Sequence, residues 1–367
     1  MTAKPTLAEL AGPLLEAMPA REIVALDLGD CRIEIATNHP PLAERLRHYF
    51  RHVTVDRGAA ADIRVVALEC PAPDFGLAFT DWPRDPGKVG RKDAFADVGG
   101  GRVCHKVRTG MQFLFGGGLR LAVGPCLEND NQVINFVNAQ YSSWLLDRGW
   151  SLCHAAGVVS RGRGLAVAGL SGGGKSTLSL HLMSHGFSFT SNDRLLIRRD
   201  GDGTRMAGIP KLPRINPGTA LHNPDLEPVL PGQRRRELET LDEDDLWELE
   251  EKYDVDITAL FGADRFATVG PLDVFVVLAW SRESDQPTRL QRVEPAARPD
   301  LLRAVMKSPG PFYLPAGDAP PPAPLAVDPR AYLANLTGVA VYEATGKVDF
   351  GAAVEACQEI LWAVAER

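Results

Sequence analysis

The chain has 367 residues, of which 45% are hydrophobic and 24% are charged, and this composition is typical of a globular protein with room for two separate cores. Its formal net charge of -7 at neutral pH excludes a general attraction for nucleic acid or for an anionic membrane. No stretch approaches the about 18 unbroken apolar residues of a membrane span, and the N-terminus lacks the pattern of a signal peptide. We therefore expect a two-domain cytoplasmic protein without nucleic-acid or membrane partners, and we leave open a homo-oligomer.

Six cysteines are scattered along the chain without a CxxC pair and without a Cys/His spacing that suits zinc. Such cysteines are typical of a reduced cytosolic protein, where most thiols are small buried apolar groups. We expect no redox or metal role for them. They are Cys31, Cys70, Cys104, Cys126, Cys153 and Cys357.

Residues 1–125 predict a compact α+β domain. Apolar residues alternate on both sides of a Gly-Asp turn in residues 22–38, which predicts two strands. Residues 40–53 have apolar side chains at helical spacing, and residues 62–69 predict another strand. Residues 101–124 predict a β-meander whose turns fall at glycines. The domain shows no catalytic constellation.

A helix is predicted next, because apolar side chains from Val133 to Leu145 share one helical face. We assign residues 126–149 to this helix, as a bridge between two domains, and expect the polar run 129–132 to cap its start. From residue 150 to 367 the order of strand, glycine-rich turn, strand, phosphate loop, helix and strand predicts an α/β domain.

Three later stretches complete this domain. The almost continuously apolar residues 272–280 predict a strand buried on both faces, and residues 338–344 predict another. The proline-rich segment near 308–329 is expected to be a surface loop or linker. The acidic run 242–257 has apolar residues at helical intervals and predicts a helix with one solvated face.

A phosphate-binding loop is the clearest motif of the chain, because Gly169, four further residues and the triplet Gly174, Lys175, Ser176 match GxxxxGK[ST]. A predicted strand precedes the loop, and a predicted helix that Gly186 closes follows it. Glycines let backbone N–H groups point at phosphate oxygens, while the lysine meets the β- and γ-phosphates and the Ser176 hydroxyl can ligate Mg²⁺. The alternative is a degenerate loop retained for folding. The predicted nucleotide-binding residues are Gly169, Ser171, Gly172, Gly173, Gly174, Lys175, Ser176 and Thr177.

An acidic residue, Asp193, follows Lys175 by only 18 positions, after a predicted strand and beside Asn192. We expect it at the carboxyl end of the strand next to the phosphate-loop strand, where ligands of open α/β sheets bind. There a carboxylate can hold Mg²⁺ through water or accept the proton of an attacking hydroxyl. A turn or capping aspartate without chemistry is the alternative.

Two further candidates lie on either side of this stretch in the sequence. His154 precedes the phosphate-loop strand, and a lone histidine there is more often packed and hydrogen-bonded than catalytic, although it can converge with Asp193 beside the γ-phosphate. The proline-stiffened loop 206–224 carries Lys211 and Arg214, whose charges suit a transition state with charge spread over phosphoryl oxygens. Incidental surface charge is the alternative for this loop.

The stretch from His154 to Asp193 resembles the catalytic core of HPr kinase/phosphorylase and its relatives, in which a histidine precedes the phosphate-loop strand and an acidic pair follows one short helix later. The loop GLSGGGKSTLS is also similar to that of ATP-dependent phosphoenolpyruvate carboxykinases, whose fold is related. Over residues 20–350 the chain most resembles the HPr-kinase-related kinase branch labelled B, which tends to accompany ATP-grasp enzymes. The segments that carry this resemblance are RTGM, NQVINFVN, PRINPGTALHN and LWELEEKYDV.

The resemblance implies an α/β fold with a phosphate-loop kinase core of the HPr kinase/phosphoenolpyruvate carboxykinase type behind an N-terminal α+β domain. It implies a kinase that uses ATP and Mg²⁺ to phosphorylate a hydroxyl, typically serine. Related kinases act on HPr, free serine or ribosomal peptide precursors, so the acceptor stays open and includes products of neighbouring genes such as an ATP-grasp enzyme. The implied catalytic residues are Asp193, His154, Lys211 and Arg214. The implied metal-associated residues are Ser176, Asp193 and Asn192.

Two departures from that family shape the expectation. Asn192 stands where the family has the first acid of the pair, and an amide can position a hydroxyl or ligate a metal but cannot accept a proton. The family's later acidic motif is not recognisable in residues 205–216, where cations appear, so phosphorolysis is not expected. An ATP-binding regulatory or assembly subunit with little transfer is the alternative that Asn192 favours. A decarboxylating carboxykinase is disfavoured because its basic substrate-binding pattern is not evident around the core.

Overall fold

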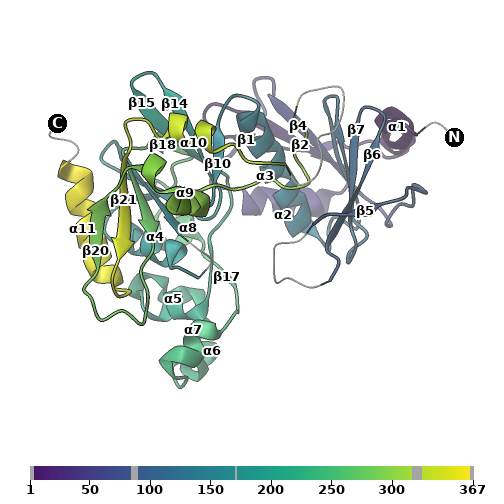
Figure 1. Cartoon of the computed structure of the whole chain (residues 1–367). Helices are drawn as coiled ribbons and strands as arrows, with labels where there is room; N and C mark the ends of the chain where they lie inside the picture. Colours follow the sequence, from purple (N-terminus) through teal and green to yellow (C-terminus); the bar gives the residue numbers. More distant parts are fainter. Residues whose placement is uncertain (1–3, 84–89, 170–171, 316–324, 364–367) are drawn as a thin grey trace. The chain divides into compact units, whose positions relative to one another are not determined.

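The computed structural model describes residues 4–83, 90–169, 172–315 and 325–363. The chain divides into two compact units (Figure 1). Unit 1 comprises residues 1–149 together with 308–327, and unit 2 comprises residues 150–307 together with 328–367. The chain therefore passes between the two units three times.

Unit 1 is built on a nine-stranded sheet with the order β3-β1-β2-β4-β9-β8-β7-β6-β5. Strand β4 runs parallel to both of its neighbours, and the other adjacent strands are antiparallel. The predicted pair of strands around the Gly-Asp turn and the predicted meander are confirmed as β1–β2 and β7–β9. The strands are β1 (Glu22–Asp27), β2 (Arg32–Thr37), β3 (Thr54–Val55), β4 (Ile63–Glu69), β5 (Thr80–Asp81), β6 (Asp93–Val98), β7 (Gly101–Lys106), β8 (Gln112–Gly116) and β9 (Leu119–Gly124).

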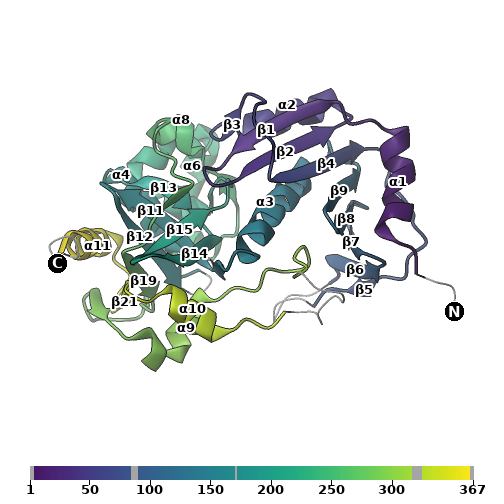
Figure 2. The same ribbon diagram turned by 90° about the horizontal axis from the view of Figure 1, so that it is seen from above.

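Among the described residues of unit 1, three helices cover the two faces of this sheet. They are α1 (Leu7–Ala17), α2 (Pro40–Tyr49) and α3 (Asp130–Leu146). Helix α1 packs against β8 and β9 on one face of the sheet. Helix α3 contacts β4 and β9 on the other face (Figure 2). The prediction that a polar side chain caps α3 is wrong, because the cap residue Asn129 instead donates its side-chain amide to Pro125 O at 2.9 Å.

The described start of the proline-rich segment, residues 308–315, belongs to unit 1. The Phe312 ring lies 5.1 Å from that of Phe113 and 5.4 Å from that of Phe136, and only 9% of Phe312 is exposed. The Cys104 thiol also donates to the carbonyl oxygen of Pro311. The sequence composition predicts that this segment is a surface loop of the phosphate-loop domain. In the structure its start packs in unit 1 instead, because the Phe312 ring is buried there. Residues 316–324 of that loop lie outside the described residues.

Unit 2 contains a six-stranded sheet with the order β13-β11-β12-β19-β21-β20, a four-stranded sheet with the order β10-β14-β15-β18, and the pair β16-β17. The strands are β10 (Ser151–Cys153), β11 (Ala155–Ser160), β12 (Arg163–Gly169), β13 (Ser188–Ser191), β14 (Leu195–Asp200), β15 (Gly203–Gly208), β16 (Arg214–Ile215), β17 (Tyr253–Asp254), β18 (Val269–Pro271), β19 (Val274–Leu278), β20 (Arg289–Arg292) and β21 (Ala340–Thr345).

The centre of the six-stranded sheet is parallel, since β12, β19 and β21 run in one direction. Alternate residues such as Leu165, Val167 and Val276 pack with α4 (Lys175–Ser184) and α11 (Phe350–Ala363), which lie side by side (Figure 1). Helix α9 (Pro299–Val305) and strands of the four-stranded sheet contact the other face. Every residue of β19 is buried, as the apolar run predicts.

The acidic run is helical only at its start. Helix α7 (Glu243–Glu248) ends at an extended Leu249, and Tyr253 and Asp254 form β17 against β16. The helix prediction is therefore wrong beyond Glu248, because pairing with a distant strand overrides the local periodicity. The remaining short helices of unit 2 are α5 (Pro217–Leu221), η1 (Pro224–Val229), α6 (Gly232–Leu238), α8 (Ile257–Phe261), η2 (Pro295–Ala297) and α10 (Pro329–Asn335). None of the helices in the described ranges combines the length and apolarity needed to cross a membrane.

Candidate active site

The predicted phosphate loop, residues 169–176, joins the end of β12 to the start of α4, as the motif predicts. Gly174 is the residue that caps α4, and both Gly172 and Gly174 have left-handed backbones, with φ of 81° and 88°. Residues with a Cβ rarely adopt this backbone conformation, so the loop favours glycine at these two positions. Ser171, which the sequence assigns to nucleotide binding, lies outside the described residues.

Lys175 lies in the first turn of α4, and its side chain points back to the loop. Only 8% of the residue is exposed, and its Nζ donates to the carbonyl oxygen of Gly169 at 2.9 Å. Burial lowers the pKa of the ammonium, the negative charge of Asp193 opposes this, and the positive charge of Lys307 adds to it. The lysine therefore lies within electrostatic reach of both side chains.

Two aromatic residues that the sequence reasoning missed hold the loop. Trp280 Nε1 donates to Gly173 O at 2.9 Å, and the ring of Phe350 packs against Gly174, where an added Cβ would lie 2.7 Å from it. Trp280 follows β19, which pairs with β12 in parallel. The sequence contains the strand and its terminal tryptophan, but not the information that this strand adjoins the phosphate loop.

The other predicted nucleotide-binding residues lie on the first turn of α4. Thr177 Oγ1 is 2.8 Å from Thr219 Oγ1, so this hydroxyl links α4 to α5, within the loop 206–224. Ser176 is half-buried, and its carbonyl oxygen accepts a hydrogen bond from Ser179 Oγ at 3.0 Å.

Asp193 lies two residues beyond β13, and the prediction that its strand neighbours β12 is wrong. Strand β11 lies between the two and is antiparallel to both, so β13 runs in the same direction as β12. The carboxyl ends of β12 and β13 therefore meet at one edge of the sheet. Asp193 reaches the predicted edge from one strand farther away than expected.

Basic side chains lie at both oxygens of the Asp193 carboxylate. His154 Nε2 lies 2.9 Å from Oδ1, and Lys307 Nζ lies 3.6 Å from Oδ2. The side chain of Asp193 remains 52% exposed. Partial burial would raise its pKa, but the hydrogen bond with His154 and the charge of Lys307 outweigh burial and hold the pKa below its ordinary value. The group is thus an ionised carboxylate that a ligand can reach.

The structure also shows how these partners are placed. His154 is the single residue between β10 and β11 and so stands where the chain passes from the four-stranded to the six-stranded sheet. Lys307 follows α9 and lies 114 positions after Asp193 in the sequence, outside every motif. No pattern in the sequence could have identified Lys307.

Asn192 Oδ1 is buried and has no hydrogen-bond partner among the described residues. A buried acceptor of this kind calls for a partner, and amide, carboxylate and hydroxyl oxygens are the donors that Mg²⁺ prefers. The predicted set of Ser176, Asp193 and Asn192 therefore fits that ion. In the described part of the chain, no three or more His, Cys, Asp or Glu side chains cluster so that they could hold a metal. The predicted set differs from such a cluster because it combines one carboxylate with an amide and a hydroxyl.

The two predicted cations of the loop 206–224 differ in their surroundings. Burial and the charge of Arg194 lower the pKa of Lys211, whereas the charge of Asp193 raises it, which places this lysine in the field of the site. Arg214 Nε instead lies 3.2 Å from Asp254 Oδ1, and its side chain is 53% exposed. Lys211 thus lies within electrostatic reach of Asp193, while Arg214 pairs with Asp254 on β17.

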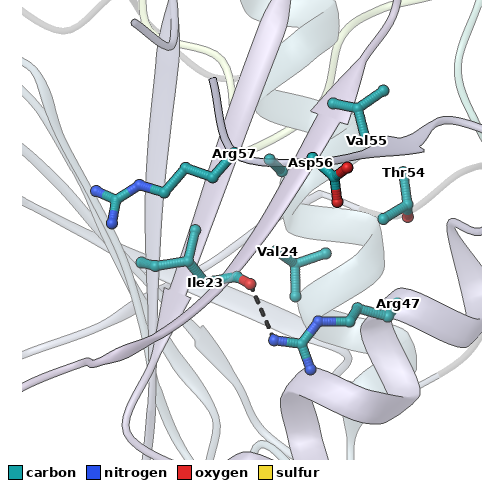
Figure 3. Close-up of a pocket in the computed structure, with 8 residues that line it drawn as sticks. Ile23, Val24, Arg47, Thr54, Val55, Asp56 and Arg57 are labelled. Atoms are coloured by element: carbon teal, nitrogen blue, oxygen red, sulfur yellow. Dashed lines mark hydrogen bonds between the residues drawn. The ribbon is translucent and has the colours of Figure 1, made fainter. Parts of the chain in front are cut away.

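Two cavities lie away from the predicted site residues. In unit 1 a cavity of about 500 Å³ is lined by the start of β1, by residues 54–57 and by Arg47 (Figure 3). Arg47 reaches across it and donates to Ile23 O at 3.0 Å. In unit 2 a cavity of about 330 Å³ lies at the β11–β12 turn, at the opposite end of β12 from the phosphate loop. Neither cavity is lined by a predicted site residue.

No protein-family model matches the chain, and no curated protein sequence matches it. Among solved structures, the chain is similar to the HPr(Ser) kinase/phosphatase from Coxiella burnetii, with a TM-score of 0.30 and 13% sequence identity, over 59% of this chain and 90% of that chain. A similarity of this size does not establish the function of the chain. The resemblance of the sequence to the branch labelled B remains a prediction.

Proposed function

We propose that the protein is an ATP-dependent kinase that transfers the γ-phosphoryl group to a serine-like hydroxyl of a protein, a peptide or a small molecule. The observation that carries the proposal is the accessible, ionised carboxylate of Asp193 at the same sheet edge as the phosphate loop. A loop of this kind binds phosphate without such a carboxylate, whereas a carboxylate at this position can orient an attacking hydroxyl and accept its proton.

The phosphate side of the reaction belongs to the loop and α4. Backbone N–H groups at the N-terminus of α4 bind phosphate oxygens, helped by the helix dipole. Lys175 Nζ, which donates to Gly169 O in the structure, donates to the β- and γ-phosphates when the nucleotide is bound. When bound by Ser176, Asp193 and Asn192, Mg²⁺ would supply further neutralisation of the triphosphate charge.

The acceptor side belongs to Asp193. Its free lone pairs accept a hydrogen bond from the acceptor hydroxyl and so aim that oxygen at the γ-phosphorus. As the new oxygen–phosphorus bond forms, the bond to the β-phosphate oxygen breaks, ADP leaves and the hydroxyl proton passes to Asp193. Because the pKa of Asp193 is lowered, it is a weak base, which suits a loose transition state in which orientation matters more than early proton removal.

Two basic side chains assist at this stage. His154 Nε2 donates to Asp193 Oδ1 and fixes one side of the carboxylate. Lys211 lies in the field of Asp193 and adds positive charge where negative charge spreads over the phosphoryl oxygens. Arg214, which pairs with Asp254, contributes less in this arrangement.

The test is incubation with ATP labelled at the γ-phosphate and a panel of hydroxyl-bearing acceptors: proteins encoded beside the gene, peptides and free serine. We expect a labelled phosphoester with at least one acceptor, its loss in Asp193→Ala with ATP affinity retained, and loss of ATP binding in Lys175→Met. Mass spectrometry identifies the modified hydroxyl. Tight ATP binding without transfer to any acceptor contradicts the proposal.

A regulatory or assembly subunit that binds ATP without transfer is the second candidate, and Asn192 favours it. The site has an amide where a second carboxylate would add a proton acceptor. If the protein is a specialised kinase, Asn192→Asp should raise transfer or introduce phosphorolysis. If wild type and Asn192→Asp both bind ATP and neither transfers phosphate, the regulatory function is the better one.

A further inference from the structure

The segment that follows α9 forms a short antiparallel ladder with the end of β10. His154 N donates to Val305 O at 2.8 Å, and Lys307 N donates to Leu152 O at 3.2 Å. Between these two hydrogen bonds an isolated bridge joins Cys153 to Met306. The main chains that carry His154 and Lys307 are therefore hydrogen-bonded to each other.

This pairing determines where the two side chains point. Successive side chains of a strand alternate between its faces, so residues 152 and 154 share the face on which their partners 307 and 305 lie. His154 and Lys307 are diagonal neighbours on that face, at about 7–8 Å in an ordinary ladder, which long side chains can span. Both side chains end on Asp193, one at each carboxylate oxygen.

A third element fixes the ladder. Tyr332, on α10, is only 4% exposed, and its hydroxyl donates to Leu152 O. The same hydroxyl lies 3.4 Å from Lys307 N and 3.4 Å from Lys307 O. The backbone of Lys307 is thereby held to Leu152 on β10, two residues before His154.

We propose that Lys307 is a positioning residue of the site, which together with His154 clamps the Asp193 carboxylate from both oxygens and fixes its direction toward the acceptor hydroxyl. The inference rests on the proposed kinase function. With one partner a carboxylate can still turn about its last side-chain bond, whereas two partners on opposite oxygens define its plane. Reaction geometry is sensitive to shifts of about 1 Å, so loss of the second partner should lower turnover rather than binding.

The test compares Lys307→Met with Lys307→Arg in the full chain, with Arg303→Met as the matched control. Arg303 is an exposed cation on α9, the short helix that precedes Lys307, and removing it takes away one positive charge without touching the clamp. We expect Lys307→Met to lower kcat by roughly 10- to 100-fold with the KM for ATP within about twofold of wild type. Lys307→Arg should restore most of the lost kcat, and Arg303→Met should behave like wild type.

Three results overturn the inference. An unchanged kcat in Lys307→Met shows that the second partner is not needed. Weaker ATP binding with unchanged kcat makes Lys307 a nucleotide ligand instead. A failure of Lys307→Arg to restore kcat, with a stability as low as that of Lys307→Met, shows a purely structural role.

A second readout does not depend on transfer, so that failure of the proposed function and failure of the clamp can be told apart. Crystal structures of wild type and Lys307→Met show the direction of the Asp193 carboxylate. We expect it to turn away from His154 or to lose defined density in the variant. If the carboxylate keeps its direction without Lys307, the proposed clamp is wrong, even if the protein proves to be a kinase. If wild type transfers no phosphate, the kinase proposal fails, but the comparison of the two crystal structures still tests the clamp.

Discussion

The substitution Gly174→Ala tests how the phosphate loop is built. Gly174 has a φ of 88°, and placing a residue with a Cβ in this left-handed region costs about 1–2 kcal/mol. The new Cβ would also lie 2.7 Å and 2.8 Å from two ring atoms of Phe350. Distances this short require one of the groups to move.

Phe350 cannot move freely. Its ring stacks on His181 at 5.7 Å between centroids and meets Trp280 edge-on at 5.3 Å. Crowding a packed site in this way typically costs about 1–3 kcal/mol. Together with the backbone strain, we expect Gly174→Ala to lower the free energy of unfolding of unit 2 by roughly 2–5 kcal/mol.

The measurement is urea unfolding followed by tryptophan fluorescence, with Gly172→Ala as the matched control. Gly172 has a similar φ of 81°, but among the described residues no atom lies within 4 Å of its added Cβ. Its substitution should therefore cost only the backbone term of about 1–2 kcal/mol. Equal losses in the two variants would refute the reasoning, because the contact with Phe350 would then contribute nothing.

Two further predictions concern unit 1. Phe312→Ala should lower the free energy of unfolding of unit 1 by about 3–5 kcal/mol in the same assay, because the substitution leaves a cavity among three aromatic rings. A decrease below about 1 kcal/mol would show that the Phe312 ring does not anchor residues 308–315. Burial and the charge of Arg51 lower the pKa of His52 from 6.5 to about 4, so the unfolded chain binds more protons between these values and the stability should fall as pH drops from 6.5 to 4. His52→Gln should flatten this dependence in urea titrations at several pH values, and an unchanged slope would contradict the assignment.

The local parts of the site were predictable from sequence, since the loop, its strand and its helix are adjacent in the chain. Gly169, Lys175 and Ser176 could be assigned from spacing alone, and the strand before Asp193 from its alternating phenylalanines. The order of strands could not, because the insertion of β11 between β12 and β13 depends on pairing that no local pattern encodes.

Residues contributed by distant segments escaped the sequence reasoning for the same reason. Lys307 reaches Asp193 through a ladder between β10 and the residues after α9, and Trp280 reaches the loop because β19 adjoins β12. Phe312 lies in a segment whose proline content predicts an exposed loop, yet one buried ring decides where the start of that segment packs. Composition predicts the average environment of a segment and misses the single anchoring residue.

The most direct test of the central claim is a crystal structure with Mg²⁺ and a non-hydrolysable ATP analogue. We expect the triphosphate over the N-terminus of α4, with its terminal phosphate between Lys175 and Asp193 and the Asp193 carboxylate facing the side open to an acceptor. A triphosphate bound elsewhere, or a terminal phosphate on the side of α4 away from Asp193, would contradict the account.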